Sequence, residues 1–116
     1  MNEKVLRALD RINRVHGMRG AMLVSMEDGL VVADSVMEGV KSAAVAALAA
    51  SLTNRLKKAS VAGGCGAPVF LHLQCEGGAL LAVPASRGLL VAAVGDAEVN
   101  IGLARLEMLR VAEATA

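Results

Sequence analysis

The sequence contains almost no aromatic side chains. Phe70 is its single aromatic residue, and Trp and Tyr are missing altogether. Proteins that hold single-stranded nucleic acid stack its bases on aromatic rings, so this chain has little to offer for that purpose. Its formal net charge of +1 also lacks the excess of basic residues that nucleic-acid binding requires. We therefore predict that the protein has no nucleic-acid partner.

Cysteine and histidine are too few and too scattered to indicate a metal site. The chain has two of each, at His16, Cys65, His72 and Cys75. Structural zinc sites use paired ligands such as Cys-x-x-Cys, and no such pair is present. We therefore predict that the protein holds no metal. Two cysteines are also compatible with a reducing compartment, so we predict a cytoplasmic protein.

No stretch of the sequence carries a recognisable catalytic or nucleotide-binding motif. The glycine-rich segment 63–66 resembles a phosphate loop only superficially, because such a loop needs Gly-Lys-Ser/Thr running into a helix. Here Ala67-Pro68 runs into a predicted strand instead. Cys65 has no recognisable base partner to activate it as a nucleophile. We predict that the protein is not an enzyme and that it binds no cofactor.

Long uninterrupted hydrophobic segments are missing too, although 55% of the residues are hydrophobic and only 20% are charged. The longest stretch without a charged residue, 59–75, contains Gly63-Gly64, Pro68 and His72. The predicted helical stretch 42–54 is shorter than the roughly 20 residues that cross a bilayer. The N-terminus mixes acids with bases, unlike a signal or transit peptide. We predict one soluble domain over residues 1–116, without membrane insertion, that buries its apolar excess in an oligomer.

The first part of the sequence predicts a helix followed by a hairpin. Apolar residues from Val5 to Ile12 recur at helical spacing, continuing to His16, with Asn2 as a possible N-cap and Gly17 as the C-cap. Two apolar strands follow, over about 18–26 and 30–35, and Asp28-Gly29 predicts a tight two-residue turn between them. Both faces of the first strand are apolar, so both must be covered.

An alanine-rich helix is predicted over about 42–58, without a charge between Lys41 and Arg55. A helix that is apolar all round is buried all round. We expect its bulky stripe to face the sheet, and its small residues to let a second helix approach closely. The bulky stripe consists of Val45, Leu48, Leu52 and Leu56, and the small-residue set consists of Ala43, Ala46, Ala47, Ala50 and Asn54.

The basic end of this helix has two interpretations. Arg55, Lys57 and Lys58 either complement the helix dipole or contact an acidic partner. A group of carboxylates near the hairpin is similarly open, because Asp28 is explained by its turn and the others are either solvated edge groups or partner contacts. That group consists of Glu27, Asp28, Asp34 and Glu38.

After a loop over 59–68, the sequence predicts three antiparallel strands over about 69–76, 79–85 and 89–95. A last helix begins at Asp96 or Asn100 and is expected to turn four apolar residues inward, namely Val99, Leu103, Leu106 and Leu109. The order α-ββ-α-βββ-α predicts an α+β fold. In it, a five-stranded antiparallel sheet carries the long helix on one face and the two terminal helices on the other.

The predicted strand 69–76 has no Lys and no internal Pro, the residues that usually protect an exposed sheet edge. If it lies at an edge, it is available to pair with another strand. One of its faces carries Val69, Leu71 and Leu73, and the other carries Phe70 and His72.

Four stretches together resemble the Roadblock/LC7 family in its bacterial single-domain, MglB-like form, over about residues 5–114. They are GAMLVSMEDGLVVADS, AAVAALAASLTNRLKK, GGALLAVPASRGLLVAAVGD and NIGLARLEMLRVAEA. The resemblance implies the sheet order 2-1-5-4-3, which places the third strand at an edge. It also implies a homodimer in which third strands pair across a two-fold axis and long helices pack side by side. The interface is then expected to use Val69, Phe70, Leu71, His72 and Leu73 with Ala43, Ala46, Ala47, Ala50 and Asn54.

The resemblance further implies a regulatory or scaffold function toward a small Ras-like GTPase, with no catalytic residues. Arg55, Lys57 and Lys58 are then the expected partner-binding residues. One alternative is a dimeric scaffold for another signalling or motility assembly. Another is a small-ligand sensor or an enzyme, for which the sequence provides no motif.

Overall fold

The computed structural model describes residues 3–115 and contains three helices and five strands. In chain order these are α1 (Glu3–Asn13), β1 (Met18–Ser25), β2 (Val31–Val36), α2 (Ser42–Ala62), β3 (Leu71–Cys75), β4 (Gly78–Pro84), β5 (Leu89–Gly95) and α3 (Ile101–Ala114). All strands are antiparallel and form one sheet in the order β2-β1-β5-β4-β3. The predicted fold class and strand order are confirmed.

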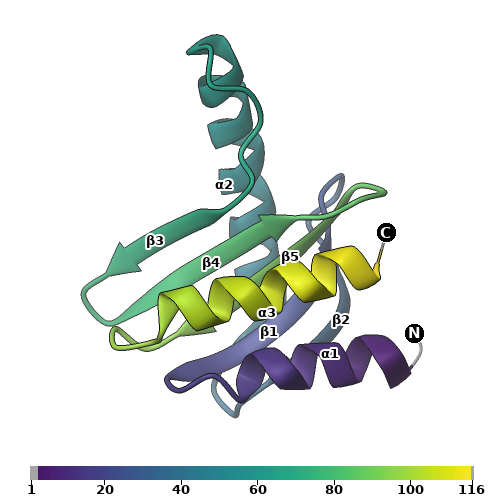
Figure 1. Ribbon diagram of the computed structural model, residues 1–116, viewed down its shortest axis with the longest axis vertical. Coiled ribbons are helices and arrows are strands. Elements are labelled where there is room, and N and C mark those ends of the chain that lie inside the picture. Colours follow the sequence, from purple (N-terminus) through teal and green to yellow (C-terminus); the bar gives the residue numbers. More distant parts are fainter. Residues whose placement is uncertain (1–2, 116) are drawn as a thin grey trace.

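The sheet is the middle of three layers (Figure 1). Helices α1 and α3 lie side by side on one face, and α2 covers part of the other face. Successive residues of β1 point to opposite faces, so Ala21 and Leu23 join the cluster under α1 and α3. Met22 and Val24 join the cluster under α2. The central position of β1 explains why both of its faces are apolar.

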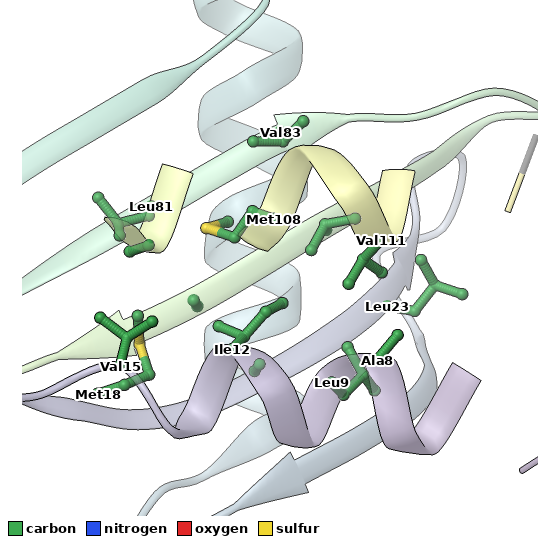
Figure 2. Close-up of a cluster of buried hydrophobic side chains, with 14 of the residues drawn as sticks. Ala8, Leu9, Ile12, Val15, Met18, Leu23, Leu81, Val83, Met108 and Val111 are labelled. Atoms are coloured by element: carbon green, nitrogen blue, oxygen red, sulfur yellow. The ribbon is translucent and has the colours of Figure 1, made fainter. Parts of the chain in front are cut away.

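The larger core cluster lies between the sheet and the two terminal helices. Figure 2 shows Leu9 and Ile12 of α1, Met108 and Val111 of α3, and the strand side chains that they approach. Leu9, Ile12 and Met108 have no exposed surface. Each large aliphatic side chain buried in this way contributes roughly 1.5–3 kcal/mol to folding.

Helix α1 is shorter than its periodicity indicates. It ends at Asn13, and His16 is exposed in the following turn, although Val15 is buried as expected. Gly17, with φ +86°, lies in this turn and is not the C-cap of the helix. Asn2, the expected N-cap, lies outside the described residues. The predicted extension to His16 is wrong because the chain must turn there to enter β1.

The β1–β2 connection is not the predicted two-residue turn. Only Gly29 has positive φ, at +72°, whereas a tight hairpin of that kind requires it at both central residues. Asp28 instead accepts a hydrogen bond from the Leu30 N–H at 3.1 Å, and the strand register shifts between Leu23 and Val24. The β4–β5 connection does form such a turn, because Arg87 and Gly88 have φ +62° and +70°.

Helix α2 turns a different face to the sheet from the one predicted. Its buried residues are Ala46, Ala49, Ala50 and Thr53. Leu48 and Leu56 are 56% and 42% exposed, while Val45 and Leu52 are half-buried. The prediction that the bulky stripe faces the sheet is therefore wrong for Leu48 and Leu56. Small side chains let the helix lie close to the sheet, whose strands provide the large side chains of this core cluster.

Helix α2 also extends beyond its predicted end, to Ala62, so the segment 59–62 is helix rather than loop. Its last turn contains no basic residue. The helix dipole affects charges mainly within the last turn. Arg55, Lys57 and Lys58 lie before the last turn of α2, so the dipole does not explain them. The C-terminal half of α2 projects past the sheet (Figure 1).

Helix α3 also turns a partly different set of residues toward the sheet from the one predicted. Asn100 is its N-cap, as one of the two predictions had it, and accepts a hydrogen bond from the Leu103 N–H at 3.1 Å. Ala104, Met108 and Val111 are buried, and Val99 and Leu109 pack inward as expected. Leu103 and Leu106 are each 45% exposed, so the prediction that they face inward is wrong.

Candidate functional site: the β3 edge and helix α2

Strand β3 is an open edge of the sheet. It pairs with β4 from Leu71↔Ala82 to Cys75↔Gly78, and its other side meets no strand among residues 3–115. It is shorter than predicted, starting at Leu71 and ending at Cys75, and it contains no charged residue, proline or irregularity. Natural proteins normally protect such an edge. Strand β3 therefore offers a row of backbone donors and acceptors to another strand.

The opposite edge, β2, is better protected. Its pairing with β1 contains a bulge, and its Asp34 carboxylate accepts a hydrogen bond from the Ser42 hydroxyl. Bulges and charges discourage the approach of another strand. Of the two edges, β3 is the one that is suited to pairing.

The five residues predicted for this edge make different contacts within the chain. Val69 precedes the strand and is 72% exposed. Phe70 packs against the core under α3, and the Arg105 guanidinium lies 5.5 Å from its ring centre. The His72 Nε2 atom lies 3.0 Å from Gln74 Oε1 within the strand. Leu71 and Leu73 alternate with these residues and lie on the α2 face, since they pair with Ala82 and Leu80.

A groove of about 600 Å³ separates β3 from the projecting half of α2. Its walls are mostly apolar, with Thr53, Ser60 and His72 as the polar exceptions. They include Leu52, Leu56 and Ala59 of α2, Phe70, Leu71 and Leu73 at β3, and Leu80 and Ala82 of β4. Leu73 is 43% exposed. The α2–β3 surface, as we call Leu48, Leu52, Leu56, Leu71 and Leu73, joins an apolar helix stripe to an unpaired strand edge.

The small-residue set predicted for a helix–helix contact is divided by the fold. Ala46 and Ala50 are buried against the chain's own sheet, whereas Ala43 and Ala47 are exposed. The Asn54 side-chain amide donates to the Met26 carbonyl oxygen at 3.3 Å, so it borders the β1–β2 loop. Sequence reasoning missed that Leu48 and Leu56 are exposed. The recurrence of small residues at 46, 49, 50 and 53 could have indicated the true inner face.

Exposed positive charge accompanies this surface. Arg55, Lys57 and Lys58 lie on α2, which carries no acidic residue between Ser42 and Ala62. None of the three makes an ion pair with another described residue. Glu27 and Glu38 of the predicted carboxylate group are exposed, while Asp28 and Asp34 bond to Leu30 and Ser42.

The residues with potential chemistry are not brought together. Within residues 3–115, His, Cys, Asp and Glu form no group of three or more that is arranged to hold a metal ion. Cys65 and Cys75 are both exposed and free. The glycine loop 63–66 follows the end of α2, where a helix presents carbonyl oxygens rather than the N–H groups that bind phosphate.

No helix in the described part of the chain combines the length and the hydrophobicity that crossing a membrane demands.

Comparison with known proteins gives consistent results. Residues 4–94 match the Roadblock/LC7 domain family. Over 107 residues the chain is 35% identical to the uncharacterized protein MJ1340 of Methanocaldococcus jannaschii, covering 92% of each. It resembles the solved Roadblock/LC7 domain from Streptomyces avermitilis with a TM-score of 0.84 and 22% identity, over 94% of this chain and 92% of that one. An MglB in a tetrameric arrangement has a TM-score of 0.84 and 24% identity, over 97% and 85%.

Proposed function

This chain belongs to the Roadblock/LC7 domain family, and from that premise we propose that it is a homodimeric, non-enzymatic regulatory or scaffold protein that binds a small Ras-like GTPase. The observation that carries the proposal is the unprotected edge of β3 beside the apolar groove. We also propose that residues 1–116 form one domain and that it works in the cytoplasm, where exposed thiols such as Cys65 and Cys75 stay reduced.

The proposed dimer pairs the β3 strands of two copies across a two-fold axis. Such an interface uses the same patch twice, and antiparallel pairing of a strand with itself satisfies this symmetry. Pairing satisfies the free backbone hydrogen-bond donors and acceptors of the β3 edge, and each copy covers the groove of the other. A stable interface buries more than about 1,000 Å² in total. A similar solved protein, MglB, is described in a tetrameric arrangement, which supports self-association.

The proposed helix contact lies on a different face of α2 from the one that the alanine pattern indicates. Since Ala46 and Ala50 are occupied by the chain's own sheet, a partner helix reaches the exposed side instead. Leu48 and Leu56 are exposed there, and the half-buried Leu52 lies between them at i+4. Burying these leucines accounts for the apolar excess of the sequence.

The GTPase is proposed to dock on the outer side of the paired α2 helices. Arg55, Lys57 and Lys58 supply the positive charge for this contact. An arginine supplied to a GTPase active site accelerates hydrolysis by roughly 10³–10⁵. Arg87 occupies a two-residue turn, which projects too little for that purpose. Any stimulation then comes from holding the partner's switch loops in a competent state.

Calorimetry with a candidate Ras-like GTPase from the same organism tests the proposal. We expect binding that differs between the GDP-loaded and GTP-analogue-loaded forms. If neither form binds, the result contradicts GTPase recognition and favours a dimeric scaffold for another signalling or motility assembly. In single-turnover hydrolysis, Arg55→Ala and Arg87→Ala are expected to keep most of any stimulation. A hundredfold loss with intact binding would show that the protein supplies a catalytic arginine.

A further inference from the structure

The β3 edge carries an exposed histidine, His72, which pairs with Leu81 of β4. Leu81 belongs to the core cluster under α1 and α3, and residues opposite each other on neighbouring strands share one face of the sheet. His72 therefore lies on the α3 side of the edge. Phe70 and Gln74 lie on the same side, because successive strand residues alternate between the faces. We call Phe70, His72 and Gln74 the α3-side row.

No acidic partner balances a positive charge on His72. Within residues 3–115 the imidazole takes part in no ion pair, and its Nε2 atom lies 3.0 Å from the uncharged Gln74 Oε1. The Arg105 guanidinium of α3 lies over the Phe70 ring, so α3 adds positive charge beside the row. Strand β4 has no ionisable side chain, and the α2 residues that line the groove are uncharged.

The carboxylates in the connections around the row are exposed and unpaired with His72. They are Glu76, which follows β3, and Asp96 and Glu98, which flank the carbonyl that accepts a hydrogen bond from Gln74. These groups act on His72 in a single copy of the chain as well. They therefore do not offset a repulsion that arises only between two copies.

The symmetry of the proposed dimer brings two α3-side rows together. The two copies are related by a two-fold axis, and in a continuous antiparallel sheet this axis is perpendicular to the sheet. Rotation about it keeps the α3 side of both copies on the same side. His72 of one copy therefore meets the α3-side row of the other copy and not the side that carries Leu71 and Leu73.

The length of β3 sets how close the two imidazoles come. Pairing centred on residue 72 puts them directly opposite each other, with Cβ atoms about 4.5–5.5 Å apart. Pairing centred one residue to either side makes them diagonal neighbours, about 7–8 Å apart. The strand runs from Leu71 to Cys75, so its midpoint is residue 73, which is one of these registers.

We propose that His72 makes the dimer sensitive to pH, because protonation of both copies places like charges across the paired β3 strands. This inference rests on the proposed homodimer. Histidine is the side chain that ordinarily changes its charge between pH 5 and 8, and like charges opposite each other destabilise a strand pair. Separate monomers take up both protons without this repulsion, so the dimer weakens as the pH falls through that range. Acid then also removes any binding surface that needs both α2 helices.

Sedimentation equilibrium over a dilution series tests the proposal by measuring the dimer dissociation constant at about pH 7.5 and about pH 5.5. We expect the constant to rise roughly two- to sixfold at the lower pH, the range that proton linkage allows when repulsion hinders the second of two protons. His72→Gln is expected to abolish the rise. His16→Gln is the matched control and is expected to keep it, because His16 is exposed in the turn before β1, which β5 and β4 separate from β3.

Two further measurements keep the test decisive. If the dimer stays intact at every dilution, exchange of subunits between two differently labelled preparations replaces the dissociation constant, and acid is expected to speed it. Added sodium chloride is expected to recover part of the affinity lost at the lower pH, because salt screens exposed charges.

The outcomes separate this inference from the proposed function. A dimer of equal strength at both pH values overturns the role of His72 and leaves the dimer itself standing. So does a pH dependence that survives His72→Gln, disappears with His16→Gln or ignores salt. A monomer at every pH contradicts the proposed homodimer, and the role of His72 with it.

Discussion

The guanidinium carbon of Arg105 lies 5.5 Å from the centre of the Phe70 ring, and this contact joins helix α3 to the segment that enters the edge strand β3. Phe70, the single aromatic residue of the sequence, thus lies beside the least protected edge of the sheet. Phe70 also packs against the core under α3. Together the two contacts hold the start of β3 in place, so the edge is presented in a defined position.

Replacing Arg105 by Ala is expected to lower the free energy of unfolding by about 0.5–1 kcal/mol, the value of an exposed cation–π contact. Urea denaturation at a fixed protein concentration measures the change. Lys57→Ala, which removes an exposed cation without a ring contact, is the matched control and is expected to have little effect. Equal values for the two variants would show that the ring contact does not contribute to stability.

Replacing Leu73 by Glu is expected to convert the proposed dimer into a folded monomer. Leu73 is 43% exposed in one copy, so the folded chain tolerates a charge there, whereas a paired apolar interface does not. Light scattering after gel filtration at micromolar concentration measures the mass. Val32→Glu places the same charge beside the other edge and is expected to leave the dimer intact. A dimer that persists with Leu73→Glu would move the interface away from β3.

Ala49→Leu is expected to destabilise the protein by about 1–3 kcal/mol, because the added atoms have no room between α2 and the sheet. Ala44→Leu introduces the same side chain at an exposed position of the same helix and is expected to change stability by less than about 0.5 kcal/mol. Thermal and urea unfolding compare the two variants. A smaller loss at Ala49 than at Ala44 would contradict the observed orientation of α2.

Gly17→Ala and Gly39→Ala separate backbone strain from steric overlap. Both glycines have positive φ, at +86° and +92°, so each alanine adds strain of about 1–2 kcal/mol. At Gly17 the new Cβ would also lie 2.8 Å from the Cα of Val99, whereas nothing lies within 4 Å at Gly39. We therefore expect Gly17→Ala to cost clearly more free energy of unfolding. Equal costs would mean that the turn moves away from Val99 freely.

Several features of this protein follow from the sequence alone. Alternating apolar residues predict the five strands, and the short turns between neighbouring strands predict that these run antiparallel. Both signals are local properties of the sequence. The double-sided hydrophobicity of residues 21–24 predicts a central strand covered on both faces, as observed. The family resemblance adds the strand order, which the structure confirms.

Only the tertiary structure decided which side of each helix faces the sheet. In α2 and α3 a hydrophobic pattern nearly all round leaves several orientations possible, and bulk suggested Leu48, Leu56, Leu103 and Leu106 as inner residues. In α2 close packing selected small residues instead, because the strands already fill that space with Met22, Leu80 and Leu90. In α3 the inner residues are Ala104, Met108 and Val111. The exposed leucines result from contacts between segments that are distant in the sequence. The recurrence of small residues at 46, 49, 50 and 53 is compatible with the inner face of α2, but it becomes decisive only once the strands that pack against it are known.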